Sequence, residues 1–386
     1  MRLACGAALS SVLSSIVKRR DCAVRLDIGV VLPNRFERCK QASFEKIQRV
    51  FSDLYTLICL TAVRDGIELD FPGGVDARVF ILEERSEDGD GEPGINLSVS
   101  GPIIDIPTLA SSERPYDLVL SVESEEGEGV VREYLRLRGL TDRSPPTLRR
   151  VTGGTSMTRS QDPTISSASL GLPRPHPHQS VIVGGTFDHL HIGHKLLLTG
   201  TALALTPEPT EPAEQVPRQI TIGISGDELL TKKKYAAYVE SWEDRQKRTA
   251  EFFESVAVFS SSIQAARNEQ HINDPGPNGK CVRVRIGSTL TINYVQISDP
   301  FGPTITEEDI SALVVSKETR SGGKAVNEKR VEKGWAPLEI LEVDELDAAP
   351  EAEEVEDRGL TENSESKISS TEIRKRLAEM KKDPTS

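Results

Sequence analysis

One short segment of the chain, VIVGGTFDHLHIGH at residues 181–194, constrains the fold more than any other. A three-residue apolar run of strand type ends in two glycines, and a helical pattern begins near His194. Further strand-like runs occur at 219–224, 282–286 and 312–316, separated by helical segments at 242–255 and 323–333. Strands that alternate with helices are typical of a parallel sheet with helices on both faces. Residues 180–380 are therefore predicted to form an α/β domain.

The turn that follows the first strand carries small and polar groups. Gly184 and Gly185 remove side chains where the backbone must turn tightly beside a ligand. Thr186 then offers a hydroxyl and Asp188 a carboxylate. In parallel sheets, ligands bind beyond the carboxyl ends of the strands. The turn is therefore predicted to line a binding site.

Two histidines follow the turn with helical spacing. His191 and His194 are three residues apart, so both imidazoles lie on one face where the helix begins. Gly193 is predicted to let a nucleotide approach the backbone. The helix N-terminus adds free N–H groups and a positive dipole, which favour phosphate. A zinc site is the alternative, but no cysteine lies nearby to complete it. The pattern favours nucleotide binding without a protein-bound metal.

A second motif, KISSTEIR, lies at residues 367–374. Ser369, Ser370 and Thr371 precede a helix-like run, where hydroxyl side chains cap the helix and face phosphate oxygens. Arg374 lies one turn inside the helix and is predicted to reach the same phosphates. Alone this is an ordinary capped helix. Together with the first motif it predicts a triphosphate site.

The two motifs resemble the (H/T)xGH and ISSTxxR signatures of the nucleotidyltransferase superfamily. Within it the chain most resembles the phosphopantetheine adenylyltransferases of the eukaryotic type, including the adenylyltransferase part of animal coenzyme A synthase. The stretches at 223–245, 297–304 and 314–330 support that choice. The resemblance covers about residues 180–378 and excludes the N-terminal region. It implies a Rossmann-like fold.

The resemblance also implies a reaction. AMP would pass from ATP to 4′-phosphopantetheine, giving dephospho-coenzyme A and pyrophosphate in coenzyme A biosynthesis, with Mg²⁺ accompanying ATP. No covalent intermediate is expected, and the protein would position the phosphates and neutralise their charge.

The resemblance implies roles for individual residues. Thr186 would hold the attacking phosphate, and His194 with His191 would stabilise charge at the α-phosphate. One lysine of 232–234 would bridge both substrates; spacing favours Lys233, and a slip of one residue stays open. The remaining groups would grip the ATP phosphates (Ser369, Ser370, Thr371 and Arg374) or line the substrate pocket (Asp188, Lys234, Asn327 and Arg330).

The rest of the chain divides by composition. Residues 1–22 are predicted to be a flexible N-terminus, and 23–140 an additional α/β or α+β region with strand-like runs at 24–32, 77–82 and 118–122 and a helix at 44–63. That region carries no catalytic motif, so a regulatory or protein-binding role is expected. Residues 141–179, rich in Ser, Thr and Pro and containing His176 and His178, are predicted to be a linker.

The net charge of −13 comes mostly from one segment. Residues 341–366 contain eleven acidic residues and one basic residue, which predicts a disordered insert. No basic stripe indicates nucleic-acid binding, and no run reaches the length of a membrane span. Five scattered cysteines fit a reducing compartment. A cytoplasmic protein is expected, with mitochondrial association as the alternative because the first twenty residues are basic.

Three other functions compete with the predicted one. A related nucleotidyltransferase with a different phosphate acceptor is the nearest. A class I aminoacyl-tRNA synthetase shares similar signatures, but the chain has no room for that family's insertions. An inactive scaffold of the same fold is the third. A GxxxxGK[ST] motif is absent from the sequence, so the kinase step of the fused animal enzyme is not expected here, and the product should be dephospho-coenzyme A.

Overall fold

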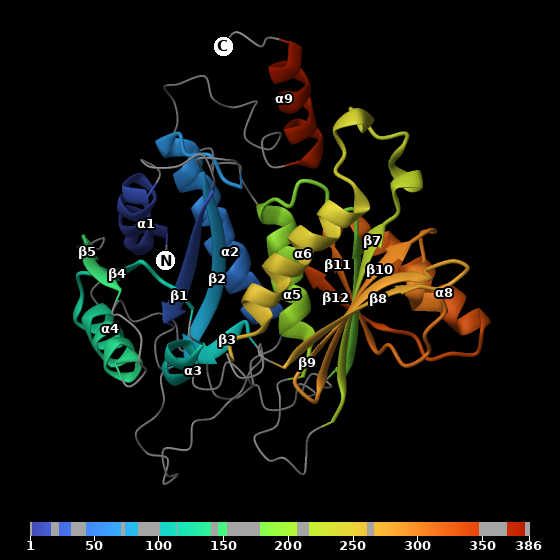
Figure 1. Cartoon of the computed structure of the whole chain (residues 1–386), viewed down its shortest axis with the longest axis horizontal. Helices are drawn as coiled ribbons and strands as arrows, with labels where there is room; N and C mark the ends of the chain where they lie inside the picture. Colours follow the sequence, from blue (N-terminus) through green and yellow to red (C-terminus); the bar gives the residue numbers. More distant parts are fainter. Residues whose placement is uncertain are drawn as a thin grey trace, which may run out of the picture.

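The computed structural model describes residues 2–16, 23–31, 44–70, 74–83, 101–112, 114–139, 146–152, 178–206, 216–260, 266–346 and 369–382. Its largest sheet has seven strands in the order β12-β11-β6-β7-β10-β9-β8 (Figure 1). The strands are β6 (Ser180–Gly185), β7 (Arg218–Ser225), β8 (Arg267–Asn273), β9 (Lys280–Ile286), β10 (Leu290–Ile297), β11 (Ala312–Ser316) and β12 (Glu339–Val343).

The first five strands in that order are parallel to one another, which confirms the α/β, Rossmann-like fold. The predicted strand at 282–286 was wrong in direction: β9 is antiparallel to β10, and β8 to β9. A short turn that contains Gly287 in the left-handed region, at φ 62°, joins β9 to β10. Two strands joined by so short a connection can only pair antiparallel.

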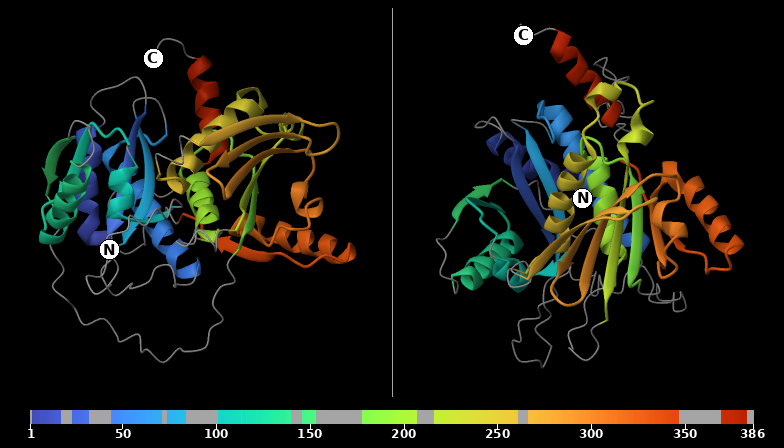
Figure 2. Two further views of the ribbon diagram at one scale, coloured as in Figure 1. Left: turned by 60° about the horizontal axis from the view of Figure 1, so that its bottom comes forward. Right: turned by 45° about the vertical axis from the view of Figure 1, so that its right-hand side comes forward.

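Helices cover both faces of this sheet (Figure 2). α5 (Ile192–Ala204) and α6 (Trp242–Ala257) lie on one face, and α8 (Arg320–Glu332) lies on the other. Alternate residues of β6 point to the two sides, so Val181 and Val183 join the core beneath α5, whereas Ile182 joins the core beneath α8. α9 (Ser370–Lys382) lies over the edge where the parallel strands end.

The N-terminal region, residues 2–152, is a second α/β unit with two small parallel sheets, β1-β2-β3 and β4-β5. Its elements are α1 (Arg2–Ile16), β1 (Val24–Val31), α2 (Phe44–Asp65), β2 (Val75–Glu83), β3 (Ile103–Asp105), α3 (Ile106–Ser111), β4 (Leu118–Val122), α4 (Glu125–Arg138) and β5 (Thr147–Val151). The strands at 24–32, 77–82 and 118–122 and the helix at 44–63 lie where they were predicted.

Two predicted boundaries are wrong at the N-terminal side. Residues 1–22 are not simply a flexible end, because α1 packs on α2 and buries Leu13 completely. The linker does not begin at 141, because β5 pairs with β4. β5 is mostly exposed and contains two arginines, so it lacks the apolar pattern by which a strand is predicted. Tertiary packing overrides a weak local pattern in both cases.

The linker and the acidic insert are each shorter than predicted. His178 is buried, forms a bridge with Leu205 and has its Nδ1 3.1 Å from Ser311 Oγ, so it belongs to the main domain. Leu341 and Val343 are buried in β12 and not part of an insert. His176 and residues 347–366 lie outside the described residues.

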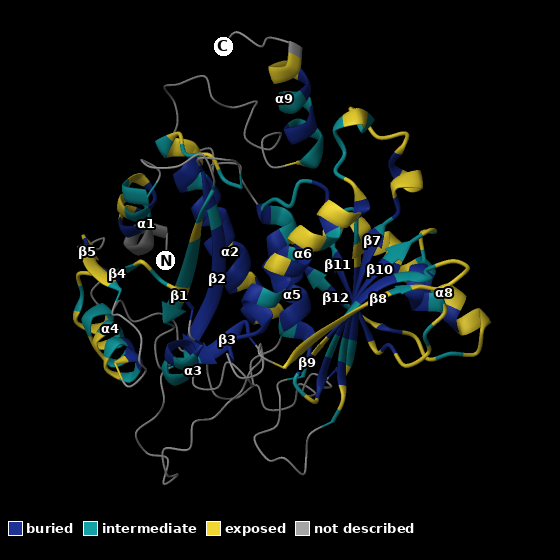
Figure 3. Ribbon diagram, in the orientation of Figure 1, coloured by how far each residue is buried: buried dark blue, intermediate teal, exposed yellow. Residues whose placement is uncertain are grey.

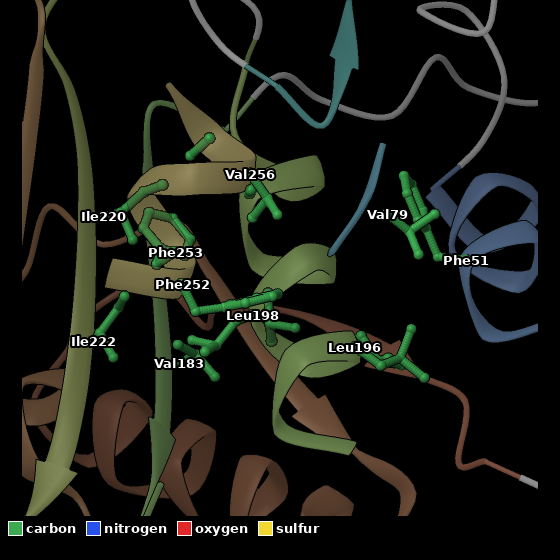
Figure 4. Close-up of a cluster of buried hydrophobic side chains, with 14 of the residues drawn as sticks. Phe51, Val79, Val183, Leu196, Leu198, Ile220, Ile222, Phe252, Phe253 and Val256 are labelled. Atoms are coloured by element: carbon green, nitrogen blue, oxygen red, sulfur yellow. The ribbon is translucent and has the colours of Figure 1, made fainter. Parts of the chain in front are cut away.

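One continuous core joins the two units. Phe51 of α2 and Val79 of β2 lie in the same buried cluster as Leu196 and Leu198 of α5, and Figure 4 shows Leu196 facing them. Figure 3 shows buried residues continuing from α2 and β2 across α5 into the large sheet. The N-terminal unit is thus packed against the helices that border the large sheet. No helix among the described residues has the length and apolar composition needed to cross a membrane.

Candidate active site

A cleft of about 1210 Å³ opens at the carboxyl edge of the large sheet. The last residues of five strands line it: Gly185, Ser225, Ile297, Ser316 and Val343. These are the parallel strands β6, β7, β10, β11 and β12. Ligands of open α/β sheets bind at this edge.

The turn after β6 is held by packing from below. Phe187 has φ 49° and is completely buried, and a Cβ at Gly185 would lie 2.9 Å from its ring. The buried Arg245 donates a 2.7 Å hydrogen bond to the carbonyl of Thr186. These contacts leave Thr186 lining the cleft, and Gly184 has no atom within 4 Å of where its Cβ would be. Both glycines and the threonine therefore lie where the sequence predicted them.

The two histidines form a stacked pair at the start of α5. His191 is the N-cap, and its Nδ1 accepts a 3.2 Å hydrogen bond from the backbone N–H of Gly193. The His191 and His194 ring centroids are 3.9 Å apart, with the rings 25° from parallel. A Cβ at Gly193 would lie 3.2 Å from the His191 ring. Gly193 thus makes room for the cap, a role that sequence reasoning did not assign to it.

Burial disfavours the charged form of both imidazoles. Burial lowers the pKa of His194 to about 4, with His189 adding repulsion against a second positive charge. Burial, and then repulsion from His194, lower the pKa of His191 well below its ordinary value. Among the described residues, Nδ1 of His194 has no hydrogen-bond partner. A neutral imidazole offers one N–H donor, which suits a phosphate oxygen.

One lysine of the run at 232–234 reaches the cleft. Lys233 follows the short helix η5 (Asp227–Leu230) and lines the cleft, whereas Lys232 and Lys234 are exposed outside its lining. The placement of Lys234 in the substrate pocket stays a prediction. An exposed ammonium group at the rim remains available to a phosphate ligand.

The second motif borders the cleft at the start of α9. Ser369, Ser370, Thr371 and Arg374 all line it. Ser369 Oγ accepts a 3.3 Å hydrogen bond from the backbone N–H of Glu372, as a helix cap does. Lys367 and Ile368 lie outside the described residues.

The guanidinium of Arg374 is committed to protein partners. Its Nη1 is 2.6 Å from Asp188 Oδ2, and its Nη2 donates to Thr371 Oγ1 at 3.0 Å. The side chains of Asp188 and Arg374 are almost fully buried. Ser370 Oγ also donates to the Asp188 carbonyl at 2.8 Å. Asp188 thus fastens α9 to the turn after β6 and does not line the cleft, so its predicted role in the substrate pocket was wrong.

Two further predictions about the pocket were wrong. Arg330 is 1% exposed and donates to backbone carbonyls, including those of Thr304 at 2.7 Å and Glu308 at 2.8 Å. Asn327 exchanges hydrogen bonds with the backbone of Leu338. Both side chains hold α8 to the loops beside it. The residues of α8 that do line the cleft lie in its first two turns, at Ser321, Gly322, Gly323 and Val326.

Sequence reasoning also missed Arg245. This side chain is fully buried and joins Thr186 O, Glu240 O and Asp227 Oδ1 beneath the site. No local pattern separates it from other arginines in α6. Asp299, another residue of the cleft, lies in the stretch 297–304 that supports the resemblance, but sequence reasoning assigned no role to it.

In the part of the chain that the structure describes, no three His, Cys, Asp or Glu side chains group closely enough to hold a metal ion. The cleft is lined by hydroxyl groups, two imidazoles, Lys233 and Arg374, and also by the carboxylates of Asp299, Glu318, Asp344 and Glu345.

Known proteins resemble parts of the chain. Residues 1–157 match a family described as a domain of unknown function (DUF8446). The chain is 36% identical over 198 residues to an uncharacterized protein of Schizosaccharomyces pombe, covering 51% of this chain and 48% of that protein. It is 31% identical over 203 residues to the phosphopantetheine adenylyltransferase of Saccharomyces cerevisiae, covering 53% of this chain and 50% of that enzyme.

An archaeal relative decides the family. The chain is 32% identical over 163 residues to the phosphopantetheine adenylyltransferase of Pyrococcus horikoshii, covering 42% of this chain and 76% of that enzyme. The chain belongs to the phosphopantetheine adenylyltransferase family. It spans about half the length of the two fungal relatives.

Proposed function

We propose that this member of the phosphopantetheine adenylyltransferase family transfers AMP from ATP to 4′-phosphopantetheine, giving dephospho-coenzyme A and pyrophosphate. The observation that carries the proposal is the meeting of Thr186, His194, Lys233 and the hydroxyl groups of 369–371 in one cleft. These residues come from three separate segments of the chain. The names of the relatives support the acceptor.

The groups in the cleft suit an in-line attack on the α-phosphorus. The phosphate of the acceptor attacks, the bond to the β-phosphate oxygen breaks, and pyrophosphate leaves. Thr186 would hydrogen-bond the attacking phosphate, and His194 would donate its N–H to an α-phosphate oxygen. Donors placed in advance where charge develops lower the barrier without reorganising during the reaction.

Lys233 and the start of α9 would bind the other phosphates. Lys233 contributes a positive charge from the rim, and the N-termini of α5 and α9 contribute N–H groups and dipoles. We propose that Arg374 acts chiefly by holding α9 in place through Asp188, because both of its terminal nitrogens already bind protein side chains.

Mg²⁺ would accompany ATP. The cleft lacks a cluster of three protein ligands among the described residues, and Mg²⁺ bound mainly by phosphate oxygens and water needs none. When bound, the ion would neutralise charge on the triphosphate. Residues such as Ser369 and Thr371 would orient the phosphates around it.

We further propose that the protein is a eukaryotic-type enzyme that acts in the cytoplasm. The resemblance of the C-terminal motifs supports the eukaryotic type, and the scattered cysteines fit a reducing compartment. Microscopy of the tagged protein with and without residues 1–20 tests the location: mitochondrial signal that depends on those residues contradicts it.

The central experiment mixes the purified chain with ATP, Mg²⁺ and 4′-phosphopantetheine, measuring pyrophosphate release and the mass of the product. Dephospho-coenzyme A should form, and pantetheine without its phosphate should give no product. His194→Ala should lower kcat by roughly 100- to 1000-fold, the usual loss of a transition-state donor. Turnover only with another phosphate acceptor points to a related nucleotidyltransferase, and ATP binding without any turnover points to a scaffold.

A further inference from the structure

The N-terminal domain, defined here as residues 2–152, contacts the site through the residue next to His194. Lys195 points away from the cleft, into the junction between α5 and the N-terminal domain. Its Nζ is 2.5 Å from Asp76 Oδ1 and forms a second ion pair with Asp70. Both carboxylates belong to the N-terminal domain: Asp70 precedes β2, and Asp76 lies within it. The lysine side chain is 3% exposed.

The ion pairs of Lys195 are not needed to hold the N-terminal domain against the large-sheet domain. Apolar packing of α2 and β2 against α5 already supplies a continuous core. A buried ion pair contributes little net stability compared with apolar residues of similar size, because taking charges out of water is costly. The two ion pairs do constrain position, because the Nζ of Lys195 has to stay within reach of both carboxylates. The triad of Asp70, Asp76 and Lys195 therefore restricts how far α5 can turn or shift at His194.

The same domain also contacts two other elements that border the cleft. Glu68 accepts two hydrogen bonds from Arg376 of α9, at 2.9 and 3.1 Å. Gln48 of α2 exchanges hydrogen bonds of 2.9 and 3.0 Å with Asp344, which lines the cleft just after β12. The N-terminal domain therefore contacts the site at α5, at α9 and beyond β12.

We propose that the N-terminal domain is an intramolecular positioning domain for the adenylyl-transfer site, and that Asp70 and Asp76 are positioning residues that act on His194 through Lys195. This inference rests on the proposed function of the cleft. It gives a role to the part of the chain that matches a domain of unknown function.

The test compares Asp76→Asn with Asp76→Glu in the full chain. Asp76→Asn leaves Asp70 to pair with Lys195, so the protein should fold, as circular dichroism can verify. Its kcat should fall roughly 10- to 100-fold, the effect of a small misplacement of a catalytic group. KM for ATP should change less than about threefold, because a donor that acts in the transition state contributes to kcat. Asp76→Glu, which keeps the charge, should recover kcat to within about threefold of wild type.

Asp70→Asn provides a second variant. Asp70 has φ 64°, and asparagine tolerates this left-handed conformation, so the change removes charge without straining the backbone. It should lower kcat in the same way. Tyr55→Phe is the matched control: Tyr55 bonds Thr199 at 3.3 Å, one turn farther along the same helix and interface. It should keep kcat within about twofold of wild type.

A readout that needs no turnover separates this inference from the proposed function. The chain has only six histidines, so the imidazole signals of His191 and His194 can be assigned by NMR. They should shift in Asp76→Asn and stay in place in Tyr55→Phe. If the wild-type protein is inactive but Asp76→Asn still shifts these signals, only the proposed reaction is contradicted. Wild-type kcat and unshifted signals in Asp76→Asn, or an equal loss in Tyr55→Phe, overturn the positioning role.

Discussion

Replacing Asp188 with asparagine should release α9 from the cleft. In the folded protein the carboxylate of Asp188 is fully buried, 2.6 Å from the guanidinium of Arg374. Its other oxygen accepts a 2.9 Å hydrogen bond from the backbone N–H of Glu240. Asparagine keeps an oxygen for that second bond but loses the charge that balances Arg374.

The magnitude follows from the burial of the pair. Removing one partner of a buried ion pair costs about 3–5 kcal/mol, because the other charge is left uncompensated. Asparagine keeps one hydrogen bond, so the lower end applies, about 3 kcal/mol. Undocking α9 avoids the cost by exposing Arg374 to water. The docking equilibrium of α9 should therefore shift by roughly 100-fold, since 1.4 kcal/mol corresponds to a factor of ten.

Hydrogen exchange measured by mass spectrometry on peptides from 370–382 reports this shift directly. Exchange should accelerate by up to about 100-fold in Asp188→Asn, and KM for ATP should rise because Ser370 and Thr371 leave the cleft. Arg376→Gln is the control on the same helix, since its half-exposed pair with Glu68 should contribute less than about 1 kcal/mol. Unchanged hydrogen-exchange protection of α9 in Asp188→Asn, or an equal acceleration of exchange in the control, would refute the claim that the Asp188–Arg374 ion pair holds α9 at the cleft.

Three further predictions follow from the site and the core. Lys233→Ala should lower kcat/KM by roughly 100-fold and Lys234→Ala by less than about threefold, because only the first lines the cleft; equal losses in a steady-state assay contradict this. Because the pKa of His194 is lowered to about 4 from its ordinary value of 6.5, its contribution to stability is complete above about pH 6.5 and is lost as the pH falls towards 4. His194→Asn should therefore lose less stability than wild type between those pH values in denaturant titrations, and parallel curves would be evidence against it. Phe51→Ala should destabilise the chain by about 3–5 kcal/mol and lower the temperature of a single unfolding transition, measured by calorimetry, that both domains share. If the large-sheet domain instead unfolds separately at its original temperature, the two domains do not share a core.

Local patterns were enough to predict the centre of the site. The turn at Gly184 and Gly185, the hydroxyl of Thr186 and the histidine pair all lie within a dozen residues, and their arrangement follows from a strand that leads directly into a helix. Lys233 could be selected from its run by spacing. Three of the parallel strands, β6, β7 and β11, were predicted from their continuous apolar runs, whereas β10 and β12 were not predicted.

Partnerships between distant residues could not be predicted in this way. Asp188 and Arg374 are 186 positions apart, and nothing near either residue shows that they pair with each other. The resemblance placed Arg330 in the substrate pocket, yet its guanidinium donates hydrogen bonds to carbonyl groups of neighbouring loops. β8 reads RNEQHIN and is mostly exposed, so it lacks the apolar alternation that marks a strand.

The core shared by α2, β2 and α5 has a consequence for how the chain is made. β2 ends at Glu83, whereas α5, which covers it, ends at Ala204. At typical synthesis rates of about 5–20 residues per second, the ribosome needs roughly ten seconds to bridge that interval. During this time the face around Phe51 and Val79 has no cover from α5, and exposed apolar faces bind chaperones or other chains. Translation products that stop before α5 should therefore aggregate or be degraded, even though they contain the whole N-terminal domain.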